Sequence, residues 1–213
     1  MTWTLPNTLT LLRLLAAPGV AVMFLYFHRP WADWFALALF VGAAVTDYFD
    51  GYLARLWKQE SNFGRMLDPI ADKALVVIAL LVLTGYSGMN PRLILPATVI
   101  LFREVFVSGL REFLGARAGT LHVTKLAKWK TTAQMVAIAV LFLGTGLEYL
   151  NGVAMQGMTP EQYVEAVSQG LADPVRACGK RDCASLANDL GIVLIWIAAA
   201  LTAMTGWEYF RKS

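Results

Sequence analysis

The stretch that decides the fold runs from Asp47 to Asp72 and reads DYFDGYLARLWKQESNFGRMLDPIAD. It joins the end of one apolar segment to the start of the next, and it contains four aspartates: Asp47, Asp50, Asp68 and Asp72. Ionisable side chains beside membrane-length apolar segments are costly, so four grouped carboxylates need a ligand that compensates their charge. The natural ligand is a divalent metal ion.

On the first of the two predicted helices, the acids share a face with small residues. At about 100° of rotation per residue, an arc of roughly 100° holds Asp47, Asp50, Gly51 and Ala54. The two small residues leave room for a ligand to approach the helix backbone closely. Arg55, one turn beyond Gly51, offers a planar fork of donors that is suited to phosphate.

On the second helix, one face repeats every fourth residue through Gly64, Asp68 and Asp72. The two acidic faces can therefore look at each other. Carboxylate oxygens suit Mg²⁺ or Mn²⁺, ions that usually share their coordination with substrate phosphates and water. A lone aspartate at a helix end is ordinarily solvated or in a salt bridge, but four at this spacing predict a metal and phosphate site.

The composition indicates a membrane protein independently of the aspartates. Hydrophobic residues make up 57% of the 213-residue chain and charged residues only 15%. Six apolar segments have about the ~20 residues that a bilayer requires, and backbone groups in lipid are satisfied within helices. The segments are about 5–27, 33–56, 67–87, 92–114, 131–150 and 187–208. We predict an all-α integral membrane protein with six transmembrane helices in one bundle and a single domain over 1–213.

The distribution of Lys and Arg predicts the orientation. These residues are more numerous in the connections next to the aspartates and at the C-terminus than in the other set of connections. The positive-inside rule then places the aspartates and both termini on the cytoplasmic side. The expected location is the bacterial inner (cytoplasmic) membrane, with several passes through it.

The longest connection, at about 148–186, lies on the opposite side. It contains Pro160, Pro174 and several glycines, so we predict an extramembrane loop with a short helix and no seventh span. Cys178 and Cys183 could form a small disulfide loop if this side is oxidising, or stay free thiols. A zinc site would need two further soft ligands.

A second polar group interrupts the fourth apolar segment. Arg103, Glu104, Ser108 and Arg111 share a helical arc of about 140°. In one interpretation, Arg103 pairs with an acid on a neighbouring helix and Arg111 extends to the membrane interface.

The alternative interpretation of this polar group is a pocket for a phosphorylated small substrate. Two arginines on one buried face need anions, and one glutamate does not neutralise both. Arg103 and Arg111 are the leading candidates to hold the phosphate, together with a following basic run. That run is Lys125, Lys128 and Lys130, of which Lys128 completes the predicted acceptor site.

The stretch 47–72 resembles, without a mismatch, the signature of the CDP-alcohol phosphatidyltransferase family, which are integral membrane enzymes of phospholipid synthesis. Residues 6–13 (PNTLTLLR), 103–112 and 128–135 resemble the branch of that family that makes phosphatidylglycerol phosphate. Together these matches span the first two thirds of the chain. The resemblance implies transfer of a phosphatidyl group from CDP-diacylglycerol to sn-glycerol 3-phosphate, with release of CMP and dependence on Mg²⁺ or Mn²⁺.

The resemblance also implies residue roles. Asp47, Asp50 and Asp68 resemble the principal metal ligands, and Asp72 resembles the general base and a further ligand. The positions that resemble contacts or clearance for CDP-diacylglycerol are Thr10, Arg13, Gly51, Ala54, Arg55, Ser61 and Gly64. The expected partners are the two substrates, the lipid bilayer and a second copy in a homodimer, and no nucleic acid.

Three other functions are compatible with parts of the pattern. The nearest is the same family with another acceptor, such as inositol phosphate, serine or a second phosphatidylglycerol, since the aspartates handle only the shared donor. An intramembrane prenyltransferase also holds a diphosphate with aspartates and Mg²⁺, but the frame of Gly51, Ala54, Arg55 and Gly64 fits it poorly. A divalent-cation transporter would leave the two arginines without a purpose.

Overall fold

The computed structural model is built from long helices, and the residues it describes contain no strand. It describes residues 5–57, 62–114, 125–154 and 183–212, with 159, 161–162, 165 and 168–169 between them. Within the helices, the side chains of 5–7, 48–57, 62–63, 65, 111, 114, 125–128, 154 and 212 lie outside the description. The helices are α1 (Leu5–Tyr26), α2 (Trp31–Trp57), α3 (Asn62–Tyr86), α4 (Pro91–Leu114), α5 (Lys125–Ala154) and α7 (Cys183–Lys212).

Each predicted apolar segment corresponds to one of these helices, so the all-α class is confirmed. The largest differences are at α5, which begins before residue 131 and continues to Ala154, and at α7, which extends past both predicted ends. Helical hydrogen bonding continues beyond the apolar part of a segment, because polar side chains there can reach water or headgroups. Residues 148 to 154, which were predicted to begin the loop, therefore belong to α5.

The described part of the long connection agrees with a short helix, since Glu161, Gln162 and Glu165 are helical. Cys183 begins α7 and is disulfide-bonded. Cys178, with which the sequence analysis paired it, lies outside the described residues.

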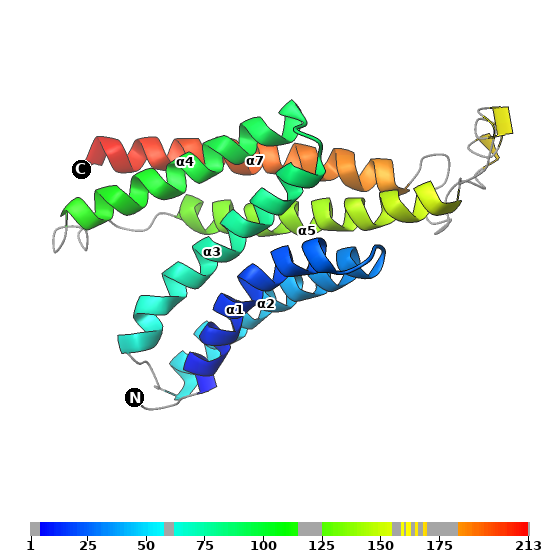
Figure 1. Cartoon of the computed structure of the whole chain (residues 1–213). Helices are drawn as coiled ribbons and strands as arrows, with labels where there is room; N and C mark the ends of the chain where they lie inside the picture. The colour runs from blue at the N-terminus through cyan, green and yellow to red at the C-terminus, as the bar shows by residue number, and fades with distance from the viewer. Residues whose placement is uncertain are drawn as a thin grey trace.

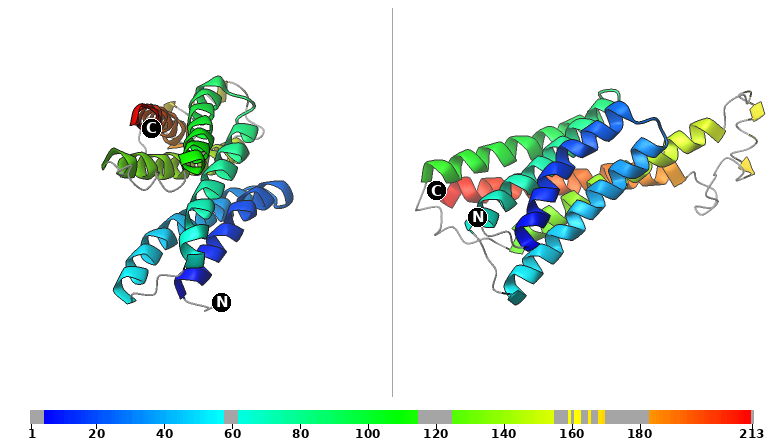
Figure 2. Two further views of the ribbon diagram at one scale, coloured as in Figure 1. Left: turned by 90° about the vertical axis from the view of Figure 1, so that its left-hand side faces the viewer. Right: turned by 60° about the horizontal axis from the view of Figure 1, so that its bottom comes forward.

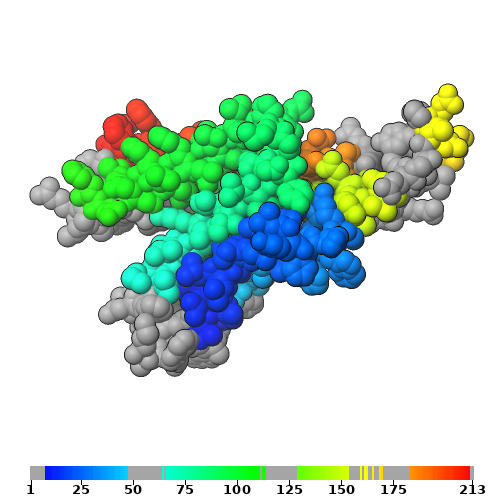
Figure 3. Space-filling view, viewed as in Figure 1, coloured from blue at the N-terminus to red at the C-terminus, as the bar shows by residue number. Residues whose placement is uncertain are grey.

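The helices form two groups that cross at α3 (Figures 1 and 2). α5 and α7 pack along each other, and α4 lies on α7. α1 packs on both α2 and α3, and α2 reaches α5. The start of α1, the end of α2 and the start of α3 converge at one end of the molecule, which we call the acidic end (Figure 1). Figure 3 shows α3 between α1 and α4 on one face.

Close packing holds the groups together where they meet. The ring of Phe142 in α5 lies 5.7 Å from that of Phe24 in α1 and 5.7 Å from that of Phe40 in α2, measured between centroids. A Cβ atom added at Gly191 in α7 would lie 2.7 Å from Cδ2 of Leu141, so only glycine allows this approach of α5 and α7. Small residues at helix contacts are typical of bundles in lipid.

Four helices have described stretches that are long and apolar enough to cross a membrane: Thr8–Tyr26, Pro91–Leu110, Trp129–Val153 and Cys183–Arg211. The described parts of α2 and α3 do not reach the same measure, and these are the helices that carry the aspartates. Large apolar side chains such as Leu15, Phe102 and Trp207 point outward. The chain is therefore a multi-pass membrane protein, and the acids lie on α2 and α3.

At the opposite end from the aspartates, an arginine joins the α1–α2 connection to α5. Arg29 donates from Nε to Asp33 Oδ2 at 2.8 Å and from Nη2 to Asp33 Oδ1 at 2.6 Å. Its Nη2 also donates to the carbonyl oxygen of Thr145 at 3.1 Å. The guanidinium lies 5.1 Å from the ring centroid of Tyr86 and 5.0 Å from that of Tyr149. We call this group the Arg29 clamp.

Candidate active site

Arg13 connects the acids of α2 and α3 at the acidic end. Its Nη1 lies 2.7 Å from Oδ1 of Asp47 and 3.2 Å from Oδ1 of Asp72. Its Nε donates to the carbonyl oxygen of Ala43 at 3.3 Å, which fixes the guanidinium against α2. The Arg13 side chain is 1% exposed, whereas those of Asp47 and Asp72 are 45% and 37% exposed. One buried cation therefore holds two carboxylates that remain accessible from outside the protein.

Thr10 orients the third described acid. One turn before Arg13 on α1, its Oγ1 donates to Oδ1 of Asp68 at 2.7 Å, and Thr10 is buried. The bond holds the carboxylate of Asp68 through Oδ1 and does not involve the other oxygen, Oδ2. Thr10 and Arg13 were expected to contact the nucleotide lipid. The contacts found are to the acids, and the contact with CDP-diacylglycerol stays a prediction.

The predicted convergence of two acidic helix faces is present for the described residues. Asp68 and Asp72, one turn apart on α3, meet the same two turns of α1 that also reach Asp47 on α2. Gly64 is buried one turn before Asp68, where a larger side chain was expected to obstruct the site. The side chains of Asp50, Gly51, Ala54 and Arg55 on α2, and the whole of Ser61, lie outside the described residues.

The chemistry of the site fits a divalent ion. Carboxylate oxygens are the hard donors that Mg²⁺ and Mn²⁺ prefer, and the guanidinium of Arg13 already places one positive charge between Asp47 and Asp72. Among the residues whose side chains are described, no three acids form a group that could hold a metal ion. Asp50, the fourth predicted ligand, is not among those residues. A metal at this site therefore stays a prediction.

A second, basic cluster lies between α4 and α5. Oε1 of Glu104 lies 3.0 Å from Nη1 of Arg103 and also accepts a hydrogen bond from Nζ of Lys130. Lys73 on α3 donates from Nζ to Oγ of Ser108, so α3 joins the same cluster. Three cations face one carboxylate here, and the Nε of Arg103 is buried without a hydrogen-bond partner. The surplus positive charge favours an anionic ligand.

The basic cluster differs from the first of the two earlier interpretations, in which Arg103 pairs with an acid on a neighbouring helix. Arg103 pairs with Glu104 on its own helix, and no acid of a neighbouring helix pairs with it among the residues that the structure describes. The side chains of Arg111 and Lys128 lie outside the described residues, so their predicted part in an acceptor site stays a prediction. Lys73 was missed, although a lysine next to an aspartate inside an apolar segment is itself a signal of function. Because Lys73 directly follows Asp72 in the sequence, it links the basic cluster to the acidic end.

Comparisons with known proteins agree with one family. Residues 3–172 match the family model for CDP-alcohol phosphatidyltransferase. A protein of Cereibacter sphaeroides named CDP-diacylglycerol–glycerol-3-phosphate 3-phosphatidyltransferase is 78% identical over 213 residues, which cover 100% of this chain and 96% of the relative.

More distant relatives carry the same name. That of Rickettsia bellii is 37% identical over 207 residues, covering 97% of this chain and 93% of the relative. That of Shigella flexneri is 41% identical over 184 residues, covering 81% of this chain and 100% of the relative.

Proposed function

The chain belongs to the CDP-alcohol phosphatidyltransferase family, and we propose that it transfers a phosphatidyl group from CDP-diacylglycerol to sn-glycerol 3-phosphate. The products are phosphatidylglycerol phosphate and CMP. The observation that carries the proposal is that Thr10 and Arg13 bring Asp47, Asp68 and Asp72 to one end of the bundle. The relatives that share both the fold family and nearly the whole length are named for this reaction.

Donor binding is assigned to the acidic end. Asp47, Asp50, Asp68 and Asp72 would hold Mg²⁺ or Mn²⁺, which when bound neutralises pyrophosphate oxygens of CDP-diacylglycerol. Thr10 keeps the Asp68 carboxylate in one orientation, and Arg13 keeps Asp47 and Asp72 at a common position. The proposed contacts and clearance for the CDP group remain those predicted from the sequence: Gly51, Ala54, Arg55, Ser61 and Gly64.

Acceptor binding is assigned to the basic cluster. Lys73, Arg103 and Lys130 carry three positive charges against the single negative charge of Glu104, which suits the phosphate of glycerol 3-phosphate. Arg111 and Lys128, on the same two helices, are proposed to contribute to the same pocket. Lys73 follows Asp72 directly, so a phosphate held by the cluster positions the acceptor near the acids.

The chemical step needs a base and no covalent enzyme intermediate. The carboxylate of Asp72 takes the proton of an acceptor hydroxyl, whose oxygen forms a bond to the phosphorus that carries the diacylglycerol group. The bond from this phosphorus to the bridging pyrophosphate oxygen breaks, and that oxygen leaves with the bonding electrons as part of CMP. Because Asp72 is held by Arg13 and is partly exposed, it is both positioned and accessible.

An acceptor panel tests the proposal. Purified protein is incubated with radiolabelled CDP-diacylglycerol, Mg²⁺ or Mn²⁺, and either glycerol 3-phosphate, inositol phosphate, serine or phosphatidylglycerol. We expect release of CMP with glycerol 3-phosphate and none after chelation of the divalent ion. CMP release only with inositol phosphate would assign another acceptor. Equal CMP release with and without a chelator would refute the requirement for a divalent metal ion.

The orientation and the assembly belong to the same proposal. We place the acidic end on the cytoplasmic side of a bacterial inner membrane because Lys and Arg concentrate in the connections next to it. We also propose a homodimer, as the family resemblance implies. Labelling of single cysteines from either side of sealed vesicles tests the first, and cross-linking in membranes tests the second.

A further inference from the structure

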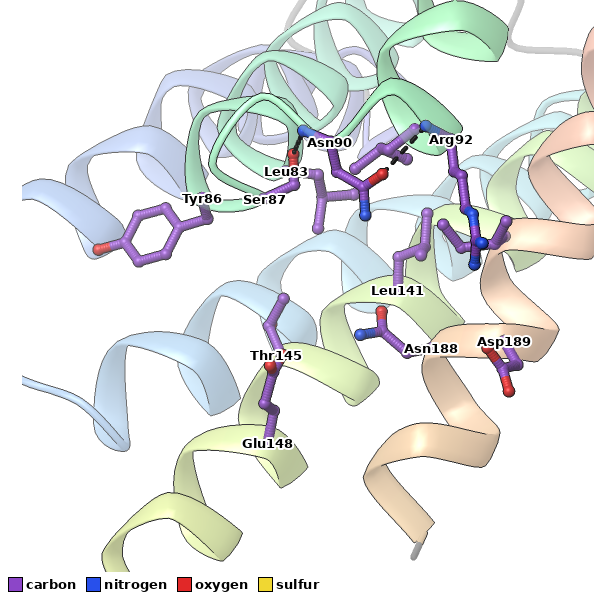
Figure 4. Close-up of a pocket in the computed structure, with 12 residues that line it drawn as sticks. Leu83, Tyr86, Ser87, Asn90, Arg92, Leu141, Thr145, Glu148, Asn188 and Asp189 are labelled. Atoms are coloured by element: carbon purple, nitrogen blue, oxygen red, sulfur yellow. Dashed lines mark hydrogen bonds between the residues drawn. The ribbon is translucent and has the colours of Figure 1, made fainter.

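A cavity of about 260 Å³ lies away from the acidic end, where α3 turns into α4 and meets α5 and α7. We call it the far cavity. Apolar side chains that line it include Leu83, Leu141 and Ile192, and charged and amide side chains also line it (Figure 4). The residues that line it on α4 come at the start of an apolar span, and those on α5 come near the end of another. The far cavity is therefore at the level of lipid headgroups on the face opposite the proposed active site.

Three charged residues that line this cavity, Arg92, Glu148 and Asp189, are exposed. Over the described residues, the guanidinium of Arg92 and the carboxylates of Glu148 and Asp189 have no ion pair and no side-chain hydrogen bond. Arg29 attracts Glu148 electrostatically, while its Nε and Nη2 donate to Asp33 and to the carbonyl oxygen of Thr145. The lining thus presents one positive and two negative groups to whatever occupies the cavity.

The positive group lies on the α4 side. Asn90 caps α4, because its Oδ1 accepts from the backbone N–H of Arg92 at 3.0 Å. The guanidinium of Arg92 therefore extends from the positive end of a long helix, where an anion is favoured. Trp196 fixes this turn by donating from Nε1 to the carbonyl oxygen of Arg92 at 3.0 Å.

The negative groups come from the other helices. Glu148 on α5 lies across the cavity from Arg92, while Asp189 and the amide of Asn188 come from α7 (Figure 4). These side chains offer oxygen acceptors for an N–H donor. They do not form an aromatic cage of the kind that recognises quaternary ammonium groups. A primary ammonium group suits this side of the cavity.

We propose that the far cavity binds the headgroup of a zwitterionic membrane lipid that joins a phosphate to a primary ammonium group. The phosphate lies at Arg92, and the ammonium lies across the cavity at Glu148. The cavity is at the lower limit of ligand pockets, so it takes a headgroup and leaves the acyl chains in the bilayer. The site is separate from the proposed transferase chemistry and uses none of its residues.

The test measures lipid retention by native mass spectrometry on the delipidated full-length protein. The probes are phosphatidylethanolamine, phosphatidylcholine and phosphatidylglycerol, with soluble O-phosphoethanolamine as a competitor. We expect about tenfold tighter retention of phosphatidylethanolamine than of the other two, as the loss of one charge-assisted contact predicts. The variant Glu148→Gln with Asp189→Asn should remove this preference, and Arg92→Gln should weaken retention of phosphatidylethanolamine.

Charge-matched variants control for non-specific effects. Glu161→Gln with Glu165→Gln changes the same net charge at exposed residues of the long connection and should keep the preference. All these variants should release CMP at the wild-type rate, which shows that they are folded. Equal retention of the three lipids, or a preference that survives in the Glu148/Asp189 variant, would overturn the proposal. Binding of O-phosphoethanolamine without retention of the lipid would overturn its assignment to a membrane lipid.

Discussion

Two arginines pair with aspartates at opposite ends of this bundle, and they do so in different ways. Arg29 uses two nitrogens on both oxygens of Asp33, whose side chain is 0% exposed, and it adds a backbone carbonyl and two aromatic rings. Among the described residues, Nη1 of Arg13 lies close to two carboxylates from two helices, and both carboxylates remain partly exposed. The carboxylate of the Arg29 clamp is fully buried, whereas the carboxylates of Asp47 and Asp72 at the acidic end remain partly exposed.

The difference separates a structural pair from a functional one. A buried carboxylate that already accepts hydrogen bonds from its arginine is not accessible to a ligand. Removing one partner of such a buried pair leaves the charge of the other uncompensated. Exposed carboxylates that share one cation can exchange that contact for a metal or a substrate. Both pairs involve α2, so the same helix is anchored at one end and available for chemistry at the other.

The largest effect is expected from Asp72→Asn, which keeps the size of the side chain but removes the base. CMP release should fall by about 10²- to 10⁴-fold, the usual contribution of a positioned general base. Binding of CDP-diacylglycerol should remain, and radiolabelled lipid binding measures this directly. Asp33→Asn is the matched control, with CMP release per folded molecule close to wild type. Normal CMP release by Asp72→Asn would refute the base assignment.

Breaking the Arg29 clamp should affect folding and leave catalysis intact. Arg29→Ala leaves Asp33 buried and unpaired, so we expect the free energy of unfolding to fall by about 3 kcal/mol. Replacing both partners, as in Arg29→Met with Asp33→Leu, should recover part of this loss because no buried charge remains. Denaturation in mixed micelles gives the free energies. A single variant as stable as the wild type would contradict the structural role.

The basic cluster predicts a change confined to one substrate. Lys130→Met should raise KM for glycerol 3-phosphate by about tenfold and leave KM for CDP-diacylglycerol unchanged, because it removes a charge-assisted contact to the acceptor phosphate. Arg111→Ala should act in the same direction. Arg211→Ala, an exposed arginine near the end of α7, is the control and should change neither constant. Equal changes in KM for both substrates would mean that the basic cluster supports the fold and does not bind the acceptor.

The smallest effect concerns Thr10, which acts through Asp68. Thr10→Val removes the hydroxyl donor while keeping the shape, so kcat should fall several-fold, as expected for one hydrogen bond of about 1 kcal/mol. Thr10→Ser restores the donor and should restore kcat. A loss that Ser does not rescue would mean that packing and not orientation of Asp68 explains the effect.

The sequence predicted the helices and, among the described residues, the convergence of Asp47, Asp68 and Asp72. Apolar segments of bilayer length predicted the six helices α1 to α5 and α7. The spacing of Asp68 and Asp72 by four residues predicted which face of α3 meets α1 and α2. The Arg29 clamp was not predicted, because Asp33 and Thr145 come together only through the packing of α2 on α5. The partners of Lys73 depend in the same way on how α3 crosses α4.

Binding of Mn²⁺ to the purified protein, followed by electron paramagnetic resonance, tests the central claim most directly. The spectrum should show bound Mn²⁺ in the wild type and in Asp33→Asn, and it should change when CDP-diacylglycerol is added. The variant Asp47→Asn with Asp68→Asn should lose this bound signal. Undiminished Mn²⁺ binding in that variant, or its loss in Asp33→Asn, would contradict the assignment of the acidic end as the metal and substrate site.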